Sequence, residues 1–155
     1  MSANLNATVN QGLIKHVRKY AERIHELAAP LDEKQFWTKP YPYGNSFGHL
    51  VLHLTGNLSY YIGAQIAQTG YVRHRDLEFT DPNPPSKEVA LASFDAAISM
   101  VIATIENQTA EDWSASYEGV GVAYCENRFE VILQCVAHLY HHIGQMIFLQ
   151  KEWTK

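Results

Sequence analysis

Apolar residues recur along the chain with the period of an α-helix in four separate segments. The first covers residues 8–28, where an apolar side chain occurs at every third or fourth position. Pro30 follows and is expected to end this helix. The apolar face consists of Leu13, Val17, Tyr20, Ile24 and Leu27.

The second predicted helix begins at Asn45 or Ser46, because either side chain can cap the N-terminus of a helix. We expect it to continue to about Thr69, with Gly70 as its stop signal. A loop rich in proline and tyrosine precedes it, and a charged loop that ends in several prolines follows it.

Two further helices are predicted in the C-terminal half of the chain. Ser86 caps the third, which covers residues 87–108. The fourth covers residues 127–151, and Asn127 and Glu130 at its start have the spacing of a capping box. The segment between these helices is predicted to be loop, with a little extended chain.

These four segments predict an all-α protein. Four helices of about 20 residues are each about 30 Å long, which is a suitable length for a four-helix bundle. We therefore expect residues 1–155 to form one bundle domain. The connecting loops are long, so the bundle can contain a crossover connection, and long ordered loops often carry functional residues.

Composition narrows the class of protein and its partners. The 155 residues are 46% hydrophobic and 18% charged, which is typical of a globular protein. A net charge of −4 without a basic block argues against a nucleic-acid partner. Polar side chains interrupt the apolar segment 47–66, which argues against a membrane span. The polar N-terminus and the two cysteines, Cys125 and Cys135, predict a cytoplasmic, reduced protein.

Histidines occupy the inward stripe of the fourth predicted helix, where apolar residues are expected. His138 and His142 lie on this stripe, whereas His141 falls well off it. In the second helix His53 lies on a similar stripe, and His49 is rotated towards water. The stripe of the fourth helix consists of Val131, Cys135, His138, His142, Gln145 and Leu149.

The three inward histidines suit a metal site. Residues four apart on a helix have Cβ atoms about 5–6 Å from each other, so His138 and His142 can bind one ion. His53 lies at a compatible depth in another helix. Three neutral imidazoles hold a divalent metal such as Zn, Ni, Fe or Co and leave positions open for substrate. The alternative is a set of hydrogen-bonded core histidines.

Other side chains have two interpretations each. Cys135 is a fourth ligand or a small buried apolar residue, and Gln145 binds near the metal or packs between helices. Arg73 and Arg75 either pair with neighbouring acidic residues to order their loop or bind a substrate carboxylate bidentately.

Three stretches, LVLHLTGNL (residues 50–58), RHRDLEF (73–79) and HLYHHIGQM (138–146), together resemble the DinB-like superfamily. The resemblance implies a four-helix bundle with up-down-down-up topology, a homodimer, and metal ligands at His53, His138 and His142. It also implies a relation to thiol-dependent transferases and isomerases. His49 and His141 are additional histidines, and either could replace or join a ligand.

The leading functional hypothesis is a metal-dependent transferase acting on a small molecule. A low-molecular-weight thiol would bind the metal, ionise, and attack an electrophile as the thiolate. Arg73 or Arg75 would orient an anionic group. One alternative is a metal-dependent hydrolase, although the histidine stripes carry no carboxylate that could act as a general base. The other is a non-catalytic, metal-binding stress-response module.

Overall fold

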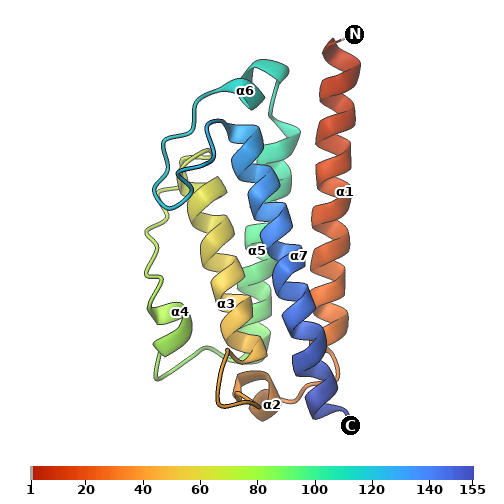
Figure 1. The fold of residues 1–155 in the computed structure, drawn as a ribbon, viewed down its shortest axis with the longest axis vertical. Coiled ribbons are helices and arrows are strands. Elements are labelled where there is room, and N and C mark those ends of the chain that lie inside the picture. Colours follow the sequence, from red (N-terminus) through yellow and green to blue (C-terminus); the bar gives the residue numbers. More distant parts are fainter. Residues whose placement is uncertain (1) are drawn as a thin grey trace.

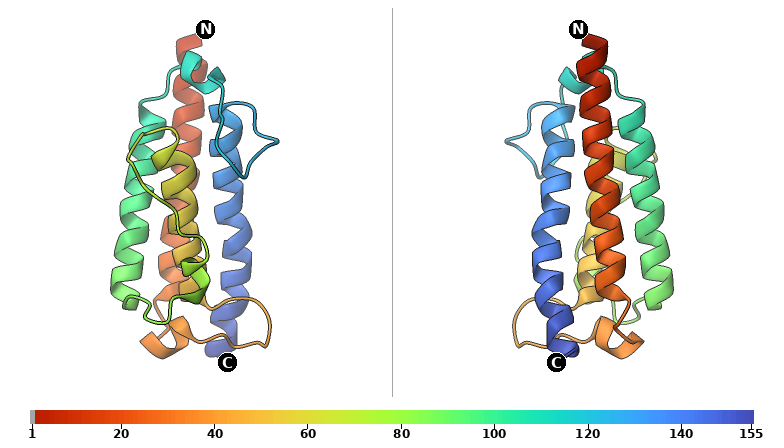
Figure 2. Two further views of the ribbon diagram at one scale, coloured as in Figure 1. Left: turned by 90° about the vertical axis from the view of Figure 1, so that its left-hand side faces the viewer. Right: turned by 90° about the vertical axis from the view of Figure 1, so that its right-hand side faces the viewer.

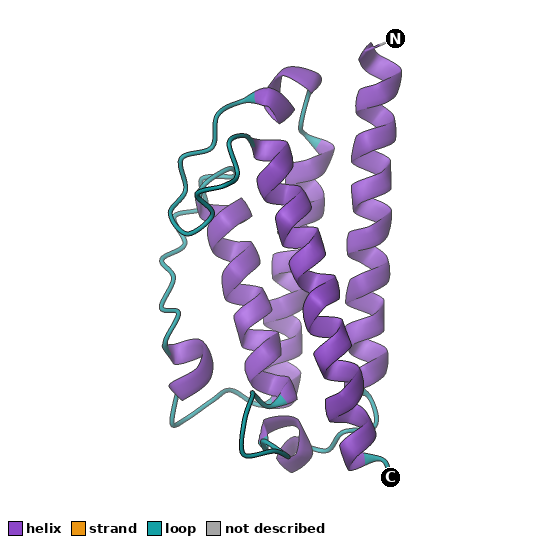
Figure 3. Ribbon diagram, in the orientation of Figure 1, coloured by secondary structure: helices purple, strands orange, loops and turns teal. Residues whose placement is uncertain are grey.

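Four long helices lie side by side in the computed structural model, which describes residues 2–155 and the side chains from residue 5 onward (Figure 1). They are α1 (Ser2–Ala28), α3 (Phe47–Leu58), α5 (Lys87–Glu106) and α7 (Arg128–Trp153). The described chain contains no β-strand (Figure 3). The predicted all-α class is therefore confirmed. Met1, the first residue of the predicted domain, lies outside the described residues.

Each long helix packs against two others. Helix α1 contacts α5 and α7, and α3 contacts the same two helices from the opposite side. The colour gradient in Figure 2 shows that α1 and α7 run in one direction, whereas α3 and α5 run in the other. Helices α3 and α7, which carry the candidate histidines, are thus antiparallel neighbours.

The second predicted helix is divided into two parts. The α-helical part, α3, is capped by Ser46, whose side chain accepts a hydrogen bond from the backbone amide of His49 at 3.1 Å. A π-helical turn, η1 (Ser59–Ala64), continues it, so the helix stops short of the predicted end at residue 69. Such turns are common at functional sites because they shift the side chains that follow.

Three short helices occupy segments that were predicted to be loops: α2 (Glu33–Trp37), α4 (Leu77–Thr80) and α6 (Ala110–Ser114). Both α2 and α6 begin with complete capping boxes, led by Asp32 and Thr109. Helices of four or five residues are too short to show a repeating apolar face, and this is why the sequence pattern missed them.

The predicted ends of α5 and α7 lie within two residues of those observed, but α1 begins at Ser2, six residues before its predicted start at residue 8. Asn127 caps α7 by accepting a hydrogen bond from the amide of Glu130 at 3.0 Å. The Glu130 carboxylate accepts from the amide of Glu126 rather than that of Asn127, so the predicted capping box is only half formed.

Helix α5 belongs to the apolar core. It is the described helix whose length and composition would allow it to cross a membrane, but buried core helices meet the same criteria. Phe94, Val101 and Ile105 of α5 are completely buried, in a helix that packs against α1 and α3. The largest other fully buried side chains are Phe36, Phe47, Ile24, Leu54, Leu58, Ile62, Ile132, Leu139 and Met146.

We expect Leu54→Ala to destabilise the protein by about 2–5 kcal/mol, because Leu54 is completely buried and its loss leaves a cavity. Leu5→Ala is the matched control, since Leu5 is 67% exposed and should change stability by less than about 0.5 kcal/mol. Urea denaturation measures both variants. Equal losses would contradict the described core.

Candidate metal centre

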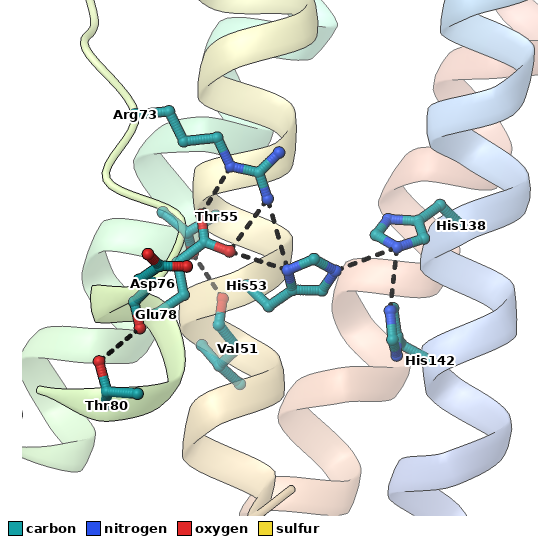
Figure 4. A network of polar contacts seen from close by, with 9 residues as sticks. All are labelled: Val51, His53, Thr55, Arg73, Asp76, Glu78, Thr80, His138 and His142. Carbon is teal, nitrogen blue, oxygen red and sulfur yellow. Dashed lines mark hydrogen bonds and ion pairs between the residues drawn. The ribbon is translucent and has the colours of Figure 1, made fainter. Parts of the chain in front are cut away.

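The three predicted histidines meet between α3 and α7 (Figure 4). The Nε2 atom of His138 lies 3.2 Å from Nε2 of His53 and 2.9 Å from Nε2 of His142. One ligating atom from each ring can be chosen so that all three lie within 4.8 Å of one another. The antiparallel packing of the two helices thus brings together residues that are 85 positions apart in sequence.

Hydrogen bonds at the far side of two rings fix which nitrogen carries the proton. His53 Nδ1 lies 2.8 Å from Glu78 Oε2, and because a carboxylate accepts, Nδ1 is the donor. His142 Nδ1 lies 2.7 Å from Gln145 Oε1, and because an amide oxygen accepts, we assign this Nδ1 as a donor too. Each ring therefore directs an Nε2 lone pair towards His138, which is the arrangement found in metal-ligating histidines.

The distances from His138 Nε2 to the other two Nε2 atoms fit a metal ion. Tetrahedral Zn²⁺ binds imidazole at about 2.0–2.1 Å, which separates neighbouring ligand atoms by about 3.3 Å. The separations of 3.2 Å and 2.9 Å are close to this value. Converging lone pairs repel one another unless a proton or a cation lies between them, so the three histidines could hold a divalent ion.

All three rings are at least partly buried: His53 and His142 are 7% and 9% exposed, and His138 is half-buried. Burial keeps the rings of His138 and His142 neutral. Burial, together with the positive charge that neighbouring histidines would add, lowers the pKa of His138 to about 3. Burial likewise lowers the pKa of His142 to about 4. Neutral imidazole is the form that binds a metal.

A buried ion pair supports His53, and sequence reasoning did not assign this role. Arg73 donates from Nε to Glu78 Oε1 at 2.7 Å and from Nη2 to Oε2 at 3.0 Å. Burial alone would raise the pKa of Glu78, but the hydrogen bonds from His53 and Arg73 outweigh it and lower that pKa. Glu78, which is 7% exposed, is therefore an ionised carboxylate that holds the His53 ring.

Gly56 explains why the carboxylate can approach α3 so closely. The Glu78 side chain and the guanidinium of Arg73 pass directly over Gly56, and a Cβ atom at this position would collide with the Glu78 carboxylate. The glycine in the HLTGN stretch is thus a packing requirement of the ion pair. Together with the acidic residue in the RHRDLEF loop, it was the sequence signal for this contact.

None of the runner-up ligands belongs to the described cluster of three histidines. His49 Nδ1 lies 2.7 Å from the hydroxyl of Ser46, and its ring packs edge-on against Trp37. His141 is exposed, although its ring lies 4.9 Å from that of His142. Cys135 is buried, and burial raises the pKa of its thiol to about 12, so the sulfur is protonated at neutral pH.

The two candidate arginines differ in their surroundings. Arg73 is paired with Glu78 through two of its nitrogens, in agreement with the interpretation as a local salt bridge. Arg75 is exposed, and its guanidinium lies 5.8 Å from the ring of Phe79, which packs against His53. Binding of a substrate carboxylate by either arginine remains a prediction.

Acid should destabilise the metal-free protein through the buried histidines. Below a pH of about 6.5 the unfolded chain binds protons at His138 and His142, whereas the folded protein does so only near their lowered pKa values. We therefore expect Tm to fall as pH decreases from 6.5 towards 4 in the presence of chelator. His138→Asn should make this decrease shallower, whereas His16→Asn, at an exposed position, should not. Identical slopes in all three proteins would contradict the assignment.

Comparison with known proteins places these features in a family. A family model described as the DinB superfamily matches residues 16–146, a range that includes Glu78 and all three histidines of the cluster. A comparison with curated proteins gave no match. Because the matched range covers most of the chain and includes α3, α5 and parts of α1 and α7, we conclude that the protein belongs to the DinB superfamily.

Proposed function

We propose that the protein is a metal-dependent enzyme in which His53, His138 and His142 bind one divalent transition metal, namely Zn, Ni or Fe. The observation that carries this proposal is the convergence of three Nε2 atoms in a buried site. Two of the rings are fixed by Glu78 and Gln145 with their lone pairs directed inward. Three ligands leave a position open for substrate, as in catalytic sites.

The reaction that we propose is transfer of a low-molecular-weight thiol to an electrophile. A divalent ion held by His53, His138 and His142 would lower the pKa of the thiol, which would lose its proton to solvent. The sulfur then forms a bond to the electrophilic carbon as the leaving group departs. The protein's own contribution is orientation, because Glu78 and Gln145 hold two of the rings and Arg73 keeps Glu78 ionised.

Hydrolysis is less well supported. It requires a general base beside the open position. Glu78 is the carboxylate that contacts the cluster, but both of its oxygens already accept hydrogen bonds from Arg73 and His53. A purely structural role for the metal predicts a large decrease in Tm when the ion is removed and no turnover in its presence.

We propose the up-down-down-up path of the four long helices, which is supported by their directions in Figure 1.

We also propose that two copies of the chain form a homodimer. The apolar groove between α1 and α7 supports it, and its lining residues include Leu13, Tyr20, Leu133 and Tyr140. Sedimentation equilibrium tests this, and a monomer at all concentrations would contradict it.

Metal binding and turnover should both require the three histidines. We expect the chelator-treated protein to bind one equivalent of Zn²⁺, and His53→Ala, His138→Ala and His142→Ala to lose that binding. His16→Ala is the control, because His16 is an exposed histidine of α1. Turnover is measured as chloride release from 1-chloro-2,4-dinitrobenzene in the presence of cysteine. Absence of bound metal from all samples would contradict the proposal, as would zinc binding that survives the three substitutions.

The ion pair should contribute to metal affinity. We expect Glu78→Gln and Gly56→Ala each to weaken Zn²⁺ binding by about 10–100-fold, because both disturb the support of His53. Gly144→Ala is the matched control, since a Cβ there meets nothing within 4 Å. That control should keep full affinity and gain stability of about 0.5–1 kcal/mol. Unchanged affinity in Glu78→Gln would show that the carboxylate does not support the centre.

A further inference from the structure

A cavity of about 350 Å³ opens one helical turn from the histidines and is used by nothing described so far. Its lining residues include Tyr41, Tyr43, Leu50, Gln145, Phe148 and Leu149. We name it the tyrosine pocket. Leu50 precedes His53 by one turn of α3, and Gln145 follows His142 by one turn of α7, so the pocket adjoins the candidate centre along both helices. We propose that the tyrosine pocket binds a neutral aromatic carbonyl compound, and its role as the electrophile site rests on the proposed function.

Gln145 belongs to both the pocket and the centre. Its Oε1 accepts the hydrogen bond from His142 Nδ1, which fixes the orientation of the amide. The Nε2 group of Gln145 therefore remains as a donor, and it makes no hydrogen bond to another described residue at this exposed position. A carbonyl oxygen placed in the pocket can accept from this amide within reach of the histidines.

The walls suit a flat apolar body. The rings of Tyr41 and Tyr43 are stacked, with centroids 5.4 Å apart and planes 10° from parallel. The hydroxyl of Tyr41 donates to Glu152 at 3.0 Å, which ties this wall to the last turns of α7. Phe148 also lines the pocket and is 68% exposed, so a ligand ring would cover aromatic surface that now faces water.

The charges near the pocket favour a neutral ligand. None of the residues that line it is charged. Of the charged groups next to its walls, Glu152 accepts from Tyr41 and is paired with Lys155, and the Lys151 ammonium lies 5.9 Å from the ring of Phe148. A volume of about 350 Å³ falls within the usual range of roughly 300–1,000 Å³ for small-molecule sites.

Fluorine NMR with three probes of similar size tests this proposal. We expect the 4-fluoroacetophenone signal to broaden on addition of the metal-free or the zinc-loaded protein. Binding of 4-fluorobenzoate, which is anionic, and of 4-fluorotoluene, which has no acceptor, should each be weaker by about tenfold. Equal binding of all three probes, or no binding of the ketone, would overturn the proposal.

Substitutions locate the probe. Phe148→Ala should weaken ketone binding by about tenfold, whereas Tyr124→Ala, at an aromatic residue that is likewise 68% exposed, should not change it. Gln145→Glu keeps an acceptor for His142 but loses the amide donor, so it should weaken ketone binding and retain zinc. Equal ketone binding by Phe148→Ala and the unmodified protein would show that the ketone does not bind in the tyrosine pocket.

Zinc binding is measured on the same samples, so the two proposals fail separately. Ketone binding without zinc binding would support the pocket as a ligand site and overturn the proposed enzymatic function. Zinc binding without ketone binding would overturn only the proposal that the tyrosine pocket is a ligand site.

Discussion

The buried contact of Glu78 with Arg73 and His53 is the interaction on which the rest of the centre depends. A carboxylate that is removed from water is costly unless it is paired and hydrogen-bonded. Here both oxygens accept from Arg73, and one also accepts from His53 Nδ1. The pair satisfies the charge and fixes the tautomer of the His53 ring, so its Nε2 lone pair faces α7. Gly56 provides the room that this contact needs.

The histidine cluster and a local salt bridge of Arg73 could be predicted from the sequence, but the contact of Glu78 with His53 could not. His138 and His142 share a helical face by their spacing, and His53 lies on an inward stripe, so local periodicity was sufficient. Glu78 is 25 positions from His53 and belongs to a four-residue helix, for which periodicity gives no signal. Its role depends on how a loop folds back over α3. The same limit explains the missed short helices and the π-helical turn, since a propensity pattern does not register an added residue per turn.

The candidate centre has two chemically different sides. On one side a buried ion pair orients His53 from the loop that follows α3. On the other, Gln145 orients His142 and extends its amide into an uncharged, tyrosine-lined cavity. We propose that the charged side keeps the centre rigid and that the uncharged side recognises the ligand.

The central claim is that imidazoles from two helices bind one ion. X-ray absorption spectroscopy of the zinc-loaded protein at the metal edge tests it most directly, because it reports the ligand atoms and their distances. The account predicts three imidazole nitrogens at about 2.0–2.1 Å and one or two further light atoms. A sulfur ligand at about 2.3 Å, which would indicate Cys135, or a shell with fewer than three imidazoles would contradict it.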